Sequence, residues 1–229
     1  ATINQGKFDA HLTSKDNNAN LDLVASGYYK TELSDVVLTG NIEKIDLNKL
    51  GFYENPLVIA GQIDAQFKDL DVDNINGNLF LKDFAIADDK GVLPISVVSL
   101  SAVSTPDSNQ FNLNSQVADA EIKGKFKPTQ IVNALSETVN QYYQFQKKST
   151  TAKLEPHQYF TLNATVKDDD LIRKFIPDLK RFETITLQAD FDSNTKKLNL
   201  EGEIPSLVYG ENQIENGKIF VNNSANKLN

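Results

Sequence analysis

The stretch IAGQIDAQF, from Ile59 to Phe67, decides the fold because every second residue along it is apolar or Gly. A period of two is typical of a β-strand with one buried face and one wet face. The same alternation recurs in Phe8 to Leu12, Leu21 to Ala25, Val36 to Ile42, Ile75 to Leu81, Phe111 to Val117, Ala120 to Phe126, Phe160 to Val166, Ile185 to Phe191 and Leu198 to Ile204. Turn-forming residues separate these stretches, as in an antiparallel sheet and not in parallel βαβ units.

One region follows this pattern poorly. Phe84 and Ile86 are expected to continue the strand that contains Leu81. Ile95, Val97 and Val98 fit no single alternating phase.

Two segments have helical spacing instead. From Pro128 onward the apolar residues lie on one stripe of a helix, and Pro is well placed in a first helical turn. These residues are Ile131, Val132, Leu135, Val139, Tyr142 and Tyr143. A polar connection, residues 147–155, follows.

The second helix is predicted over about 169–179. Asp168, Asp169 and Asp170 provide carboxylates suited to a helix N-terminus, and Pro177 is expected to end or kink the helix. Its apolar stripe is Leu171, Ile172, Phe175, Ile176 and Leu179. The chain is thus expected to comprise a first β block (1–127), a helix with a polar linker (128–155) and a second β block (156–229).

Four strands carry Gly on their apolar face, at Gly61, Gly77, Gly124 and Gly202. Gly weakens a strand, so its repeated use indicates either a sharply bent sheet with a notch or close packing under bulky neighbours. The first alternative predicts a mainly β fold, with a long curved antiparallel sheet that forms a groove and two short helices. The second predicts a closed β-sandwich.

Composition excludes several function classes. The 229 residues are 40% hydrophobic, have a formal net charge of −8 and contain no Cys. This acidic balance argues against nucleic acid as a partner and against a polybasic membrane contact. No signal peptide or apolar run of membrane-spanning length is seen. Because Met is absent even at position 1, the chain is expected to be a segment of a longer protein.

No catalytic or metal-binding pattern emerges, so we predict neither an enzyme nor a cofactor. The acidic stretch that starts at Asp69 lacks the Gly and Glu of a calcium loop, with Asn74 and Phe80 in their places. His11 and His157 have no partner at ligand spacing, and no serine lies in a nucleophile elbow. Paired carboxylates of a glycosidase remain an open alternative, although the chain has no Trp to stack sugars.

Three segments carry a family resemblance: NINGNLFLKDFAI (Asn74 to Ile86), Phe160 to Ala164 leading into Asp169 to Leu179, and Leu198 to Tyr209. They resemble the TamB (translocation and assembly module) branch of the AsmA-like proteins, in the versions found in Bacteroidetes-type bacteria. The helix at Ile131 to Tyr143 departs from that pattern.

The resemblance implies a periplasmic segment of an inner-membrane-anchored protein with an apolar trough. It further implies a role in outer-membrane protein assembly, secretion or phospholipid transport between membranes. The implied partners are phospholipid or unfolded outer-membrane protein strands, and an outer-membrane assembly barrel that another part of the chain contacts. The alternative is a structural or interaction β-sandwich domain of an envelope protein. The expected groove-lining residues are Ile63, Phe67, Leu79, Leu81, Phe111, Leu113, Leu162, Leu187, Phe191 and Leu200.

Overall fold

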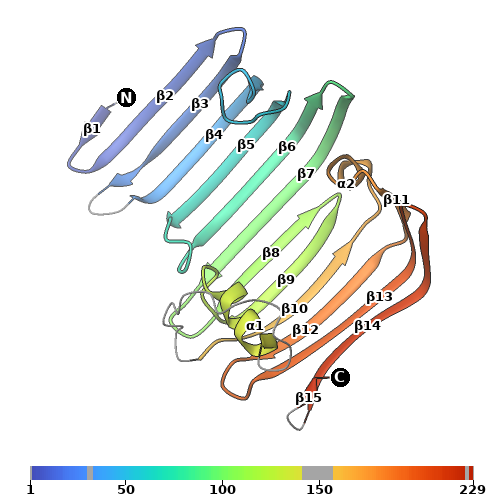
Figure 1. The fold of residues 1–229 in the computed structure, drawn as a ribbon. Coiled ribbons are helices and arrows are strands. Elements are labelled where there is room, and N and C mark those ends of the chain that lie inside the picture. The colour runs from blue at the N-terminus through green and yellow to red at the C-terminus, as the bar shows by residue number, and fades with distance from the viewer. Residues whose placement is uncertain (1, 30–32, 141–156, 225–226, 229) are drawn as a thin grey trace. The chain divides into compact units, whose positions relative to one another are not determined.

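The chain forms one open antiparallel sheet with two short helices, as the first fold expectation states (Figure 1). The computed structural model describes residues 2–29, 33–140, 157–224 and 227–228. One hydrogen-bonded path joins fourteen of the described strands in chain order, and β11 pairs with β13 off this path. Their bounds are β1 Thr2–Asn4, β2 Lys7–Lys15, β3 Ala19–Tyr29, β4 Leu33–Asp46, β5 Val58–Asp69, β6 Asn76–Asp88, β7 Gly91–Ser104, β8 Asn109–Ser115, β9 Ala118–Lys125, β10 Tyr159–Val166, β11 Leu179–Phe182, β12 Ile185–Asp192, β13 Lys197–Tyr209, β14 Asn212–Ser224 and β15 Lys227–Leu228.

The chain divides into two compact units, which are described separately. Unit 1 comprises Ala1–Asp71, Ile75–Ala102 and Leu113–Gln116. Unit 2 comprises Val72–Asn74, Val103–Asn112 and Val117–Asn229.

In unit 1 the strand registers place the alternating apolar residues on one face. Ile63 of β5 lies opposite Gly40 of β4 and Leu81 of β6, and Leu81 lies opposite Val98 of β7. Directly opposed residues share a face, so each such row runs across the strands on the same side. The neighbouring positions, such as Gln62 and Lys82, form the polar face.

The irregular spacing around Ile95 results from a β-bulge. The register between β5 and β6 shifts between Ala60 and Gln62, and Asp83 of β6 has a φ of 51°. The extra residue returns Phe84 to the face that holds Leu81. Across the sheet, Phe84 lies opposite Ile95 and Leu81 opposite Val98. This difference in spacing explains why no single phase fits this part of the sequence.

In unit 2 the same division into two faces holds. Phe160, Leu162, Ala164 and Val166 of β10 lie opposite Phe191, Ala189, Leu187 and Ile185 of β12. These rows continue onto β13, where Leu198 opposes Phe191 and Leu200 opposes Ala189. Val221 and Ile219 extend them onto β14. The polar face carries Thr, Asn, Glu and Lys at the positions between.

Both predicted helices form, and the second is shorter than expected. Helix α1 spans Ile131–Asn140, while Tyr142, Tyr143 and residues 147–155 lie outside the described residues. Helix α2 spans Asp170–Phe175, and the Asp169 carboxylate caps it by accepting from the Leu171 N–H at 2.8 Å. The helix ends before Pro177, which disfavours helical backbone at the preceding residue. Leu179 therefore belongs to β11 instead of the helix.

Three interior glycines, Gly27, Gly61 and Gly77, lie beneath aromatic rings of a neighbouring strand. A Cβ on Gly77 would lie 2.6 Å from the Phe67 ring, and one on Gly27 would lie 2.7 Å from the Phe8 ring. Gly61 contacts the Phe84 ring in the same way. A ring that covers a strand Gly fills the space left by the missing side chain. At these three positions the missing side chain admits a neighbouring ring, as the close-packing expectation states, although the sheet is open and is not a closed sandwich.

Candidate apolar binding face

In unit 1 the structure brings the predicted lining residues together. Ile63 and Leu81 are directly opposed, and Leu79 opposes Ala65 one row away. Phe67 belongs to the next row, above Gly77. Leu113 is the one candidate of β8 that belongs to unit 1. The five predicted lining residues among them are half-buried, so part of each apolar surface stays accessible, whereas Ala65 is buried.

In unit 2, four of the five predicted residues are also half-buried: Phe111, Leu162, Leu187 and Leu200. Phe191 differs, because it is only 1% exposed and lies in a closed core. That core contains Phe126, Phe160 and Leu198 as well. Phe191 is therefore a packing residue and offers no surface to a ligand.

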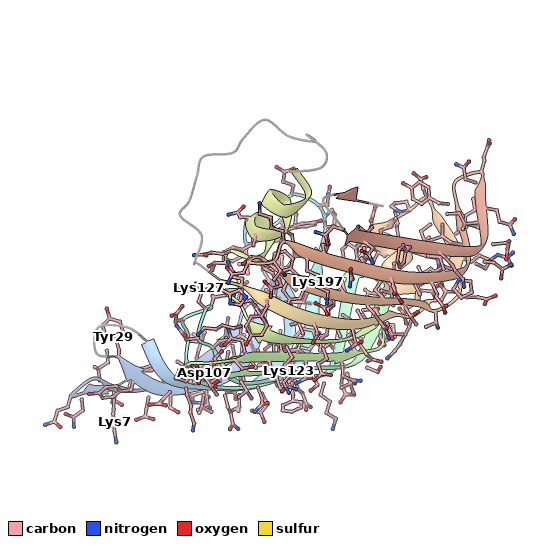
Figure 2. The ribbon with its side chains drawn as sticks, turned by 90° about the horizontal axis from the view of Figure 1, so that it is seen from below. Lys7, Tyr29, Asp107, Lys123, Lys127 and Lys197 are labelled. Carbon is pink, nitrogen blue, oxygen red and sulfur yellow. The ribbon has the colours of Figure 1, made fainter. Side chains whose placement is uncertain are left out.

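Helix α1 covers this core. Ala134 of α1 is buried in it, and Ile131 and Leu135 pack against it. Beneath them lies a continuous row of rings, with centroid distances of 5.8 Å for Phe111–Phe126, 6.0 Å for Phe126–Phe160 and 5.2 Å for Phe160–Phe191. Figure 2 shows α1 on one side of these strands, with Lys123 of β9 on the other side. Only one end of the apolar face of unit 2 is thus covered by a described helix.

A contact distant in sequence fixes the start of α1. The Asp73 carboxylate accepts hydrogen bonds from the Thr129 backbone N–H at 3.0 Å and from the Thr129 hydroxyl at 2.9 and 2.8 Å. Both residues belong to unit 2. The acidic stretch that superficially resembles a calcium loop therefore supplies an anchor for the helix.

The expected lining residues do not include Ala120, Ala164, Gly202 and Ile219, although all four lie on the apolar face. Ala120 and Ala164 are directly opposed on it, and Leu187, Gly202 and Ile219 form a row across three strands. Their place in the alternation could have identified them. Ile219, 38% exposed, extends this surface to β14.

The polar faces carry the titratable groups. His11 pairs with Asp22 at 2.5 Å, and His157 contacts Asp192 at 3.2 Å. Partial burial opposes ionisation of Asp192, but hydrogen bonds from the Thr195 and Asn194 backbone and from His157 lower its pKa below 3.8. These pairs join neighbouring strands and turns, so they are explained as structural contacts.

A hollow of about 360 Å³ lies at one end of the unit 2 strands. Lys125, Lys127 and His157 are among its lining residues, together with Asp73. Gln158, 2% exposed, is fixed there because its side-chain oxygen accepts from the Lys127 N–H at 3.0 Å. The mixture of positive and negative groups favours no particular charge on a ligand.

Within the described residues, no group of three His, Asp or Glu side chains could hold a metal ion. No helix in the described part of the chain is long and apolar enough to cross a membrane. The described strands present an extended apolar surface, and apolar surfaces of this kind associate with alkyl groups through the hydrophobic effect.

These features define the class of the protein as an open antiparallel sheet with one apolar face. Comparison with family models, with curated proteins and with solved structures found no match to this chain.

Proposed function

We propose that this chain is a non-enzymatic segment of a cell-envelope protein that holds acyl chains on its apolar sheet face. The observation that carries the proposal is the incomplete burial of directly opposed apolar residues, such as Ile63 and Leu81 in unit 1. A closed core would bury such residues as completely as Phe191. Each CH₂ group that an acyl chain buries contributes ~0.8 kcal/mol, so a long chain binds without any specific polar contact.

The resemblance to TamB-type AsmA-like proteins supports a location in the periplasm and cargo that moves between two membranes. In that setting the cargo is phospholipid or an unfolded outer-membrane protein strand. Both present alternating or continuous apolar groups that match rows of Leu, Ile and Phe side chains.

A matched pair of substitutions tests the proposal. Leu81 and Phe80 are adjacent in β6 but project to opposite faces, and Phe80 is 47% exposed on the polar face. Leu81→Gln is expected to weaken binding of a fluorescent fatty acid about tenfold. The substitution removes apolar contact that contributes roughly 1.4 kcal/mol to the binding free energy. Phe80→Gln should leave binding unchanged.

Native mass spectrometry of the purified chain provides the direct measurement. Bound lipid in the wild-type chain, diminished in Leu81→Gln and retained in Phe80→Gln, supports the proposal. A lipid-free wild-type chain that also fails to bind added fatty acid would refute it.

The second candidate is a structural or interaction domain. Its support is the covered end of unit 2, where Ala134 of α1 is buried together with Phe126, Phe160 and Phe191. Equal fatty acid binding by both β6 variants, or none by either, would favour this candidate.

A further inference from the structure

The connection between β4 and β5 in unit 1 places three large apolar side chains on the outside of the molecule. Leu50 is 42% exposed, Phe52 77% and Tyr53 45%. Figure 1 shows this connection as a loop beyond the ends of the two strands. Ordinary loops carry polar residues, so three exposed large apolar side chains within the four residues from Leu50 to Tyr53 indicate a contact surface.

The loop is held in place by its own hydrogen bonds. The Asn48 side-chain amide donates to the carbonyl oxygens of Tyr53 at 3.2 Å and Glu54 at 2.7 Å. The Phe52 and Tyr53 N–H groups both donate to the Leu47 carbonyl, at 2.8 and 3.1 Å. A surface that is ordered before contact loses little conformational entropy on binding.

We infer that Leu50 to Tyr53 forms a tip that inserts into the interfacial region of a lipid bilayer. This inference goes beyond the proposed function, which concerns the sheet face and does not require membrane contact. Three exposed side chains present roughly a few hundred Å² of apolar area, whereas a specific protein interface needs about 800 Å² per partner. A bilayer interface requires no matching surface and readily accepts Phe, Leu and the amphipathic ring of Tyr.

The charge of the chain determines whether the tip binds a neutral or an anionic bilayer. Lys49 and Glu54 beside it offset one another, whereas the whole chain carries a formal net charge of −8. Anionic lipids would repel such a chain, and salt would screen that repulsion. The tip is therefore expected to bind neutral phosphatidylcholine vesicles, with little dependence on salt, and to bind phosphatidylglycerol vesicles more weakly.

The absence of Trp from the chain permits a direct test. A Phe52→Trp variant carries a single indole at the tip. Phosphatidylcholine vesicles should shift its emission to shorter wavelength, and brominated acyl chains should quench it. The matched control is Phe80→Trp on the polar face of β6, whose emission should not change. Unchanged Phe52→Trp emission in the presence of vesicles would overturn the inference.

A second variant separates the tip from the sheet face. Phe52→Ser should reduce vesicle co-sedimentation about tenfold, because insertion of the ring no longer contributes. Its fatty acid binding should equal that of the wild-type chain. Leu81→Gln should instead reduce fatty acid binding and leave vesicle co-sedimentation unchanged. If Phe52→Ser co-sediments as strongly as the wild type, the membrane contact lies elsewhere and the inference fails. A wild-type chain that binds vesicles but no fatty acid would count against the proposed function and leave the inference about the tip supported.

Discussion

Gly124 of β9 lies directly opposite Phe160 of β10, at the end of the apolar face that α1 covers. A Cβ on Gly124 would lie 2.6 Å from the Cα of Phe160 and closer still to the Tyr159 carbonyl oxygen. The two strands can approach this closely only because position 124 has no side chain.

Gly124→Ala is therefore expected to lower the free energy of unfolding by more than about 2 kcal/mol, because the backbone of β10 must move. Gly210→Asn provides the control, since Gly210 has open space around it and a φ of 57° that Asn tolerates. Urea unfolding of both variants measures the difference. Similar stability in the two variants would contradict the close-approach explanation.

Phe191→Ala should lower the free energy of unfolding by about 3–5 kcal/mol, because it opens a cavity beneath α1. Phe220→Ala is the matched substitution, as Phe220 is 58% exposed on the polar face of β14. We expect a change within about 0.5 kcal/mol for Phe220→Ala. Thermal unfolding followed by circular dichroism compares them. Equal effects would mean that the row of rings is not the core of unit 2.

Asp192→Asn should reduce stability near neutral pH by about 1 kcal/mol, because the ionised group loses charge-assisted hydrogen bonds. The pKa of Asp192 is lower in the folded chain than its ordinary value of 3.8, so its ionised form favours folding above that pH. The contribution disappears as the pH falls through the folded pKa. The difference between mutant and wild type should therefore shrink as the pH is lowered below 3.8. A difference that is constant with pH would be inconsistent with this pairing.

Asp73→Ala should lower the free energy of unfolding by about 1–2 kcal/mol. Thr129, at the start of α1, loses the carboxylate that accepts from its N–H and hydroxyl. Hydrogen exchange should then accelerate at the first amides of α1 more than in the surrounding strands. Thr129→Ala and the double variant complete a cycle, and their effects should not add. Additive effects would show that the two residues stabilise the chain independently.

Alternation alone was sufficient to predict most strands, because each has one apolar and one polar face. It failed around Ile95, where the bulge at Asp83 changes which residues share a face. A bulge depends on pairing with another strand and so leaves no local signal. The anchor between Asp73 and Thr129 was not predictable for the same reason, since 56 positions separate the two residues.

The candidate face was predicted in part. Leu81 and Leu187 lie where alternation placed them, whereas Phe191 lies under α1. Periodicity specifies the face on which a residue lies, but coverage of that face depends on how a distant helix packs. Half-buried and fully buried positions consequently look alike in the sequence.

The strand order has a consequence for how such a chain assembles. Because almost every strand bonds to its neighbours along the sequence, most pairing can begin with local hairpins and requires few distant loop closures. A hairpin is also the smallest increment of this architecture. Insertion or loss of two strands preserves the direction and parity of all the others, so the length of the sheet can change while its apolar side stays continuous.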